Sequence, residues 1–168
     1  HTDWVITTRL DSDDAISDMY MSYVRSRSTL GRVEFLNFPE GFQFSDGRLL
    51  LYNHPSNAFI SAASYRRDDM VTVFSEWHDR LGSIAPVRQV PNLRLWVQVC
   101  HGDNVVNQER GIRADHRKYR ERFPFLEIEE QTTPRYLYDL LVTCFRAGRA
   151  VLSSPRRITR LLPKRGHA

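Results

Sequence analysis

Hydrophobic and polar positions first divide the chain into short predicted elements. Residues 4–10 are rich in β-forming side chains and predict a strand. Residues 15–28 carry apolar side chains at helical spacing, which predicts a helix that ends near Gly31. A second strand is expected at residues 33–38, because Pro39 stops the apolar run that follows the helix.

The later pattern adds strands and helices in roughly equal measure. The Asp46-Gly47 pair between two apolar runs predicts a hairpin of residues 41–46 and 48–52. Residues 59–65 fit a strand or a helix. Further elements are expected as strands at 71–74 and 93–99, a short helix capped by Ser75, a helix over 134–149 and a second one after Pro155. The sequence therefore predicts an α/β protein.

Size and composition set the class of protein. A chain of 168 residues with 41% hydrophobic and 26% charged residues has the size and composition of one globular domain. No run approaches the roughly 20 apolar residues of a membrane-spanning helix, and no secretory signal is present. The two cysteines are too few for a disulfide framework, and Cys100 lies in an apolar strand pattern. We therefore expect reduced thiols and a cytoplasmic location.

Positive charge is concentrated at the end of the chain. Seven of the 24 Lys and Arg residues lie after Phe145 with no acid among them, which leaves 17 against all 20 acids in the rest. Residues 155–165 place Ile and Leu opposite arginines, a pattern that favours peripheral contact with an anionic membrane over nucleic acid. A solvated chain end would show the same composition. We expect a basic helical extension at 134–168 after a main domain at 1–133.

Three carboxylates within four positions are the most informative chemical feature. Asp11, Asp13 and Asp14 follow directly after the first predicted strand. Ligands of open α/β sheets bind at strand ends, and Mg²⁺ or Mn²⁺ prefers oxygen ligands, so the acids are typical of a metal-bridged diphosphate site. An acid here could also cap the next helix. Three acids crowded together repel one another, which capping alone does not require.

The same residues resemble a known family. The stretch from Thr8 to Ile16 resembles the Thr-Arg-x-Asp-x-Asp-Asp-Ala motif of the putative rhamnosyl transferase family, whose proteins resemble GT-A glycosyltransferases. The resemblance continues through Phe35–Phe38, Gly41 and Trp96–Asn107 and covers roughly residues 3–112. It implies a GT-A-like mixed sheet flanked by helices, and transfer of a sugar from a nucleotide diphosphate-sugar donor to a saccharide or lipid-linked acceptor.

The resemblance also suggests roles for single residues. Asp13 and Asp14 would bind a divalent metal, Mn²⁺ or Mg²⁺, and His101 would complete its shell. Asp11 would hold the donor ribose or sugar. The residues themselves leave alternatives open: His101 could be a structural turn histidine, Arg9 could pair with Asp11 or bind the diphosphate, and Asn104 could contact sugar hydroxyls or only close a turn.

A glycosyl transfer with inversion needs a carboxylate base near the acceptor hydroxyl. Glu76 and Asp79 surround Trp77 and His78 and are the best candidates, although an amphipathic surface helix would carry the same residues. Trp77 could stack on the face of a sugar.

The first residue is His1, inside the segment that leads to the acids. In the GT-A fold, the part before this strand supplies most of the nucleotide-base pocket. By that resemblance we expect an N-terminally truncated piece, the C-terminal portion of the fold, which should bind nucleotide diphosphate-sugars weakly.

Two other functions fit part of the sequence. A metal-dependent phosphoester hydrolase could use the same acids, but such sites usually recruit more His and Asp ligands for two metals. A non-enzymatic basic module could bind membrane or nucleic acid through the tail. Aromatic residues interleaved with the arginines would favour nucleic acid, and the tail has only Phe145, so we expect no nucleic-acid partner.

Overall fold

The computed structural model describes residues 3–29, 31–66, 69–101 and 109–128, together with 137–138, 141–142 and 144–145. The chain divides into two compact units, residues 1–129 and 130–168. The described residues of the second unit are helical and fall within the helix predicted at 134–149. The basic segment 155–165 lies outside the described residues, and the expected division after residue 133 stays a prediction. All elements below belong to the first unit.

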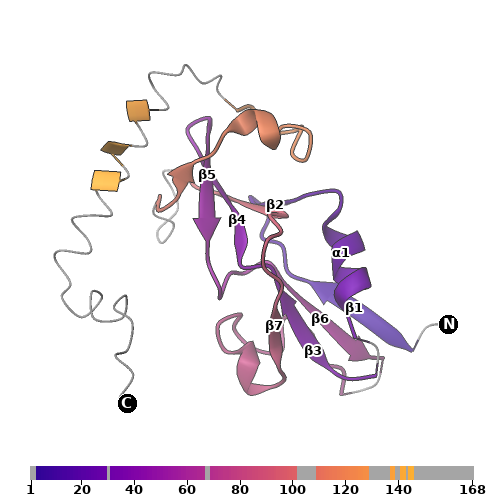
Figure 1. Cartoon of the computed structure of the whole chain (residues 1–168). Coiled ribbons are helices and arrows are strands. Elements are labelled where there is room, and N and C mark those ends of the chain that lie inside the picture. Colours follow the sequence, from indigo (N-terminus) through magenta and orange to yellow (C-terminus); the bar gives the residue numbers. More distant parts are fainter. Residues whose placement is uncertain are drawn as a thin grey trace, which may run out of the picture. The chain divides into compact units, whose positions relative to one another are not determined.

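The first sheet has four strands in the order β1-β6-β3-β7. Its strands are β1 (Trp4–Thr8), β6 (Ile60–Tyr65), β3 (Glu34–Asn37) and β7 (Val87–Gln89). β6 pairs antiparallel with β1 and with β3, whereas β3 and β7 are parallel. In Figure 1 these strands fan out together, with helix α1 (Tyr20–Arg27) beside β1.

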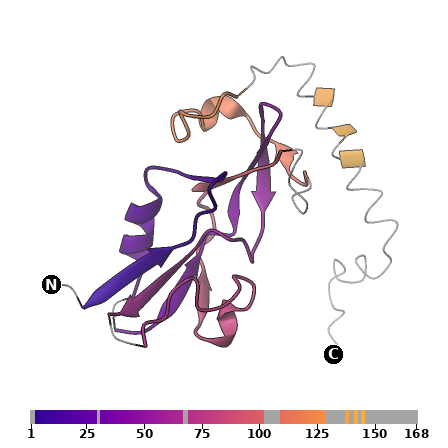
Figure 2. The ribbon, with the colours of Figure 1, turned by 180° about the vertical axis from the view of Figure 1, so that it is seen from behind.

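The second sheet has five strands in the order β2-β8-β4-β5-β9. Its strands are β2 (Ala15–Ile16), β8 (Trp96–Val99), β4 (Glu40–Ser45), β5 (Arg48–Asn53) and β9 (Ile112–Arg113). Only the β4–β8 pair is parallel. The view from behind in Figure 2 shows the β4–β5 hairpin extending away from the first sheet. The remaining elements are α1 (Tyr20–Arg27) and two 3-10 turns, Leu81–Ser83 and His116–Lys118.

Both faces of the first sheet are covered. Every residue of β3 is buried, and successive side chains point to opposite faces. Leu36 belongs to a core with Tyr20 and Val24 of α1, whereas Phe35 belongs to a core with Val73 and Leu81 of the 71–84 segment. Because the side chains of β3 alternate between the two faces, α1 packs on one side of the sheet and the irregular 71–84 segment packs on the other.

The structure corrects several sequence-based expectations. The helix predicted over 15–28 begins only at Tyr20, because Ala15 and Ile16 pair with Val97 and Trp96 as β2. Residues 71–74 are irregular with a turn at 73–74 rather than a strand, and in place of the α-helix predicted after Ser75 there are turns and the short 3-10 turn at Leu81–Ser83. Residues 59–65 resolve as a strand, and the hairpin turn at Asp46 and Gly47 is confirmed, with φ values of 47° and 71°.

The fold class is confirmed only in its coarser form. The described residues form a mixed two-sheet α/β structure that is mostly strand and contains one α-helix in the first unit. The expectation of a sheet flanked by helices is wrong for this part of the chain, because the second face of the first sheet is covered by the irregular 71–84 segment, where the short helix capped by Ser75 was expected. β1 is an antiparallel strand at the end of its sheet, and its residues are only partly buried.

Trp96 joins the two sheets. Its side chain is fully buried, stacks on Phe59 at 4.5 Å between ring centroids, and donates Nε1–H to the Phe38 carbonyl at 2.7 Å. Gly41 lies directly against the indole, and a Cβ at this position would sit 2.2 Å from Trp96 Cδ2. The glycine of β4 is therefore required by the close approach of the indole ring.

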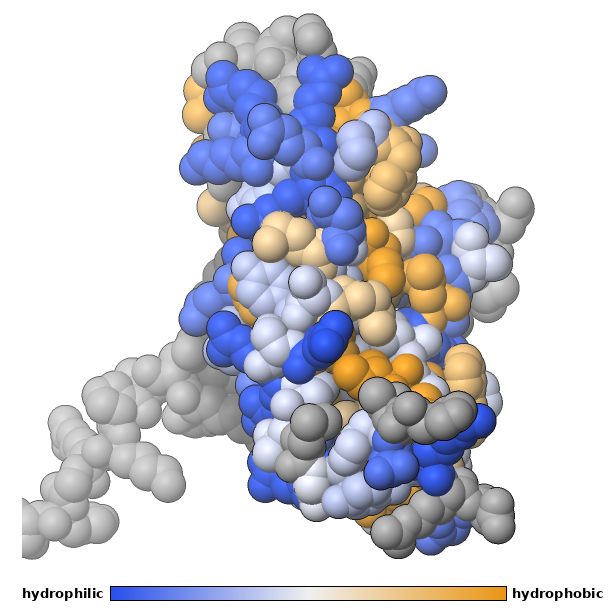
Figure 3. Space-filling view, turned by 90° about the vertical axis from the view of Figure 1, so that its right-hand side faces the viewer, coloured by the Kyte–Doolittle hydropathy of each residue, from blue (hydrophilic) through white to orange (hydrophobic). Residues whose placement is uncertain are grey.

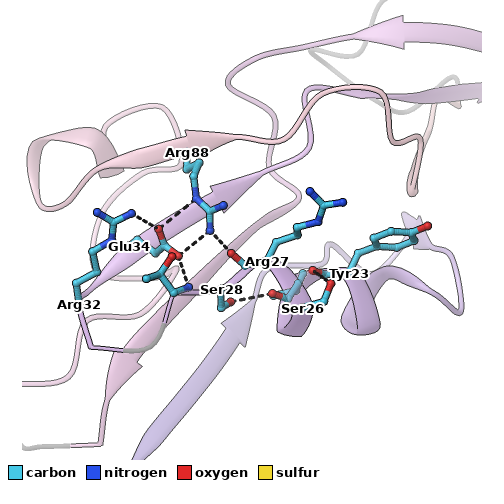
Figure 4. A network of polar contacts seen from close by, with 9 residues as sticks. Tyr23, Ser26, Arg27, Ser28, Arg32, Glu34 and Arg88 are labelled. Carbon is cyan, nitrogen blue, oxygen red and sulfur yellow. Dashed lines mark hydrogen bonds and ion pairs between the residues drawn. The ribbon is translucent and has the colours of Figure 1, made fainter.

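Glu34 is the centre of a buried ionic network (Figure 4). Its side chain is 2% exposed and accepts hydrogen bonds from Arg88 and from the Thr29 amide at 2.9 and 2.6 Å. Arg88 also donates to the Arg27 carbonyl, which ties the end of α1 to β3 and β7. Burial alone would raise the pKa of Glu34, but the hydrogen bonds from Arg88 and Thr29 outweigh it and lower the pKa below its ordinary value.

The surface on the side of α1 and β1 alternates between hydrophilic and hydrophobic areas (Figure 3). Within the described part of the chain, no helix has the length and apolar character needed to cross a membrane.

The first prediction concerns Gly41. The Gly41→Ala substitution is expected to lower the free energy of unfolding by about 1–3 kcal/mol or more, because the new Cβ overlaps the Trp96 ring. Urea denaturation followed by tryptophan fluorescence measures this change. Gly82→Ala is the matched control, since its Cβ would meet nothing closer than Val87 at 3.7 Å. Equal stability of the two variants would contradict the packing described for Trp96.

The second prediction concerns the pH dependence of stability. Because the folded-state pKa of Glu34 is lowered, its contribution is fully present above the unfolded value of about 4.5 and is lost as the pH falls through the folded value. Glu34→Gln is expected to cost about 1.5–3 kcal/mol at pH 7, where it loses a charged hydrogen-bond acceptor. Its difference from wild type should shrink below pH 4.5.

Urea midpoints measured at pH 7, 5 and 4 for Glu34→Gln and for the exposed control Glu121→Gln test this prediction. A difference between Glu34→Gln and wild type that does not change over this range would show that the Glu34 charge contributes nothing to stability.

Candidate functional site

The acidic residues lie in a loop that connects the two sheets. The Arg9 amide still donates to the Ile60 carbonyl, so the chain leaves the first sheet only after this residue. A turn then closes between the Asp11 carbonyl and the Asp14 amide at 3.1 Å, and Ala15 enters the second sheet as part of β2. We call residues 11–14 the acidic loop. Both of its ends are held by β-sheet hydrogen bonds.

Asp14 fixes the acidic loop to β8. Its Oδ1 accepts the Val99 amide at 2.9 Å, at the end of the strand. The pKa of Asp14 is raised to about 6, mainly because burial disfavours its charge, and the neighbouring carboxylates of Asp13 and Asp11 add to the increase. The Val99 hydrogen bond and His101 act in the opposite direction. The loop therefore holds negative charge in a position where it is disfavoured.

Asp13 and His101 are brought into contact across 88 positions of sequence. His101 Nε2 lies 3.2 Å from Asp13 Oδ2, and the two side chains are 45% and 40% exposed. The contact follows from the pairing of β2 with β8, because the acidic loop precedes β2 and His101 follows β8. It matches the predicted meeting of these two residues. Asn104, which was expected nearby, lies outside the described residues.

Arg9 borders an open pocket beside the acidic loop. Arg9 Nε pairs with Asp11 Oδ1 at 3.2 Å, as one of the two sequence-based alternatives expected. The pocket has a volume of about 450 Å³ and is lined by Arg9 and the 74–77 segment. Phe74 and Trp77 in this segment are 73% and 64% exposed, so two aromatic rings lie open to solvent next to Arg9.

The predicted base candidates lie on the same segment. Glu76 lines the open pocket and accepts the Trp77 amide at 2.8 Å, whereas Asp79 is exposed. Burial lowers the pKa of His78, and the charge of Arg9 lowers it further, while Asp79 and Asp11 raise it. These electrostatic effects place His78 close to both Arg9 and the acidic loop. The structure thus places residues 74–77 beside Arg9 and His78 close to Asp11, while the role of Glu76 or Asp79 as the base stays a prediction.

The metal shell expected from sequence is only partly assembled. Among the described residues, no group of three or more His, Cys, Asp or Glu side chains is arranged to hold a metal ion. Asp13 and His101 are adjacent, but one oxygen of Asp14 is used by the Val99 amide. A three-residue shell of Asp13, Asp14 and His101 therefore stays a prediction.

A second cavity is lined in part by His78 and was missed by the sequence analysis. It has a volume of about 230 Å³ and is lined by Gln43, Tyr52, His54, Asn57, Ala58, Phe59, His78, Trp96, Gln98 and Arg110. One signal was present: Gln43 and Gln98 each interrupt an apolar strand. The two residues are direct partners in the β4–β8 register and bond at 3.1 Å. Paired polar residues on neighbouring strands indicate a shared polar wall.

Comparison with protein families adds to this geometry. Residues 1–113 match the model of the family described as "Putative rhamnosyl transferase". The chain belongs to this family. The match covers the acidic loop, both base candidates, His101 and all the residues that line the two pockets. Membership in the family implies a glycosyltransferase, with a sugar donor and an acceptor.

No curated protein and no solved structure matches the chain.

Proposed function

We propose that this protein transfers a sugar from a nucleotide diphosphate donor to a saccharide or lipid-linked acceptor, with a divalent metal held at the acidic loop. The observation that carries the proposal is the Asp13–His101 contact beside the Arg9 pocket, in a chain of the rhamnosyl transferase family. Rhamnose is the donor sugar that the family description suggests.

The pair of side chains has the right spacing for one cation. Two ligand atoms in adjacent positions of an octahedron with bonds of about 2.1 Å lie about 3 Å apart. The 3.2 Å between His101 Nε2 and Asp13 Oδ2 is compatible with both atoms binding the same ion. Mg²⁺ and Mn²⁺ are commonly held by one or two protein ligands, with phosphate and water completing the shell. A shell of two protein ligands therefore suits a cation that also binds a diphosphate.

The neighbouring residues have distinct parts in this proposal. Asp14 positions the acidic loop through Val99 and adds negative charge near the cation. Arg9 is held by Asp11 at the edge of the open pocket, where a guanidinium can bind a phosphate oxygen with two hydrogen bonds. A bound metal would stabilise the charge that develops on the departing nucleotide diphosphate.

The acceptor is proposed to enter over the exposed aromatic rings. Phe74 and Trp77 offer flat apolar surfaces beside Arg9, and Glu76 lines the same pocket with a carboxylate. Glu76 is thus a better placed base than Asp79, which is exposed and does not line this pocket. A base deprotonates the acceptor hydroxyl, an effect typically worth about 10²–10⁴-fold in rate.

Glu76→Gln should lower kcat by this range and Asp79→Asn should leave it nearly unchanged; the reverse order would assign the base to Asp79.

The third prediction tests the metal. In the full protein that contains these residues, Mn²⁺-dependent release of nucleotide diphosphate from a nucleotide diphosphate-rhamnose is the assay. Asp13→Asn and His101→Gln are each expected to raise the Mn²⁺ concentration needed for half-maximal rate by at least about 10-fold, the usual loss when a metal site is disturbed. Asp18→Asn removes an exposed carboxylate close to the loop and serves as the control.

Turnover that continues at the full rate in excess chelator would contradict the metal. Turnover that needs Mn²⁺ but is unaffected by both substitutions would show that the metal binds at residues other than Asp13 and His101.

A further inference from the structure

The cavity lined in part by His78 has a wall of polar and aromatic side chains. Gln43 Nε2 donates to Gln98 Oε1 at 3.1 Å, and Gln43 Oε1 accepts the Arg110 amide at 2.9 Å, which fixes both amide groups. Tyr52 is partly exposed and packs edge-on against the buried Trp96, with 6.1 Å between ring centroids. The wall is thus built from side chains that neighbouring strands hold in place.

Several polar groups of this cavity have no partner within the described part of the chain. The Arg110 guanidinium makes no hydrogen bond or ion pair there, although Arg9, Arg48 and Arg88 all pair with acids. The imidazoles of His54 and His78 form no hydrogen bond with any described residue, and Nδ1 of His78 is buried without a partner. Buried polar atoms are usually hydrogen-bonded, so the buried Nδ1 of His78 points to a ligand in the cavity. The exposed Arg110 guanidinium and the half-buried His54 ring have no partner among the described residues and can bind the same ligand.

The charge of the cavity selects the kind of ligand. Among the residues that the structure describes, its lining contains Arg110 and no Asp or Glu. Burial lowers the pKa of both His54 and His78, which keeps the imidazoles neutral at pH 7 and leaves each with one donor and one acceptor nitrogen. A ligand that fits carries one negative group for the guanidinium and several hydroxyls for the imidazoles and amides.

We infer that this cavity binds a sugar ring that carries a carboxylate or a phosphate. The cavity of about 230 Å³ is smaller than the roughly 300–1,000 Å³ of sites for drug-sized molecules, which suits a single ring. The choice of a sugar rests on the proposed function. His78 borders the cavity and lies close to Arg9 and Asp11, so the bound ring would sit next to the reaction site.

Direct binding tests the inference without catalysis. The 168-residue chain is titrated at pH 7.5 with glucuronate, glucose 1-phosphate, glucose and inorganic phosphate, followed by NMR chemical shifts. Excess chelator prevents phosphate from binding through a metal at Asp13. At least one of the two charged sugars is expected to bind 10-fold or more tightly than glucose and than phosphate, with shifts at Gln43 and Gln98. The tighter of the two identifies the charged group.

Two variants make the result specific. Arg110→Gln is expected to weaken binding of the charged sugar at least 10-fold. Arg117→Gln removes the same charge from an arginine that is 80% exposed and paired with Asp115, and it should bind like wild type. Circular dichroism shows whether both variants keep the fold.

Three results would overturn the inference: glucose binding as tightly as both charged sugars, inorganic phosphate binding as tightly as both charged sugars, or Arg110→Gln binding the charged sugar like wild type. Failure of the proposed function looks different. Charged sugars would then still bind through Arg110, while the full protein would show no turnover of nucleotide diphosphate-sugars.

Discussion

The burial of Trp96 between the two sheets is the constraint on which the site depends. The indole fills the space between Phe59, which leads into the first sheet, and Gly41 in the second, and its only polar atom is satisfied by the Phe38 carbonyl. Because Trp96 also begins β8, its position sets the register of that strand against β2 and β4. His101 lies two residues after the end of β8, so the packing of one aromatic ring helps to determine where the candidate metal ligand lies.

The acidic loop carries the unfavourable energy of this arrangement. Three carboxylates within four residues repel one another, and Asp14 is partly buried as well, which raises its pKa to about 6. Sheet pairing on both sides and the Val99 hydrogen bond hold the loop in place despite the repulsion. A bound cation would remove much of this cost. Sites that bind ligands commonly carry strain or repulsion that the rest of the fold compensates.

Local signals in the sequence predicted the parts of the fold that depend on local chemistry. An apolar run ended by Pro39 identified β3, and the alternation of residues 93–99 identified β8. The Asp46-Gly47 pair identified the hairpin, since both residues adopt the positive φ that such turns need. The match to family motifs placed Asp13 and His101 together before any geometry was known. The strands and the hairpin each depend on a single segment of sequence, whereas Asp13 and His101 lie 88 positions apart and are linked by the family motifs.

Features that depend on distant partners were not predictable in the same way. Ile16 fits a helical pattern but pairs with Trp96 instead, so the helix begins four residues later. Val73 was read as part of a strand because it is apolar, yet it packs under the first sheet from a turn. The polar cavity arises from the β4–β8 register and from the approach of His78 and Arg110, which lie far apart along the chain.

The location of a bound Mn²⁺ tests the central claim most directly. Mn²⁺ is paramagnetic and broadens NMR signals of nearby amides, so a titration of the 168-residue chain with Mn²⁺ maps the metal without any substrate. The account predicts that the amides of Asp13, Asp14 and Val99 broaden first, and that Asp13→Asn abolishes this effect. Broadening that begins elsewhere, or that is the same in wild type and Asp13→Asn, would contradict a metal site at the acidic loop.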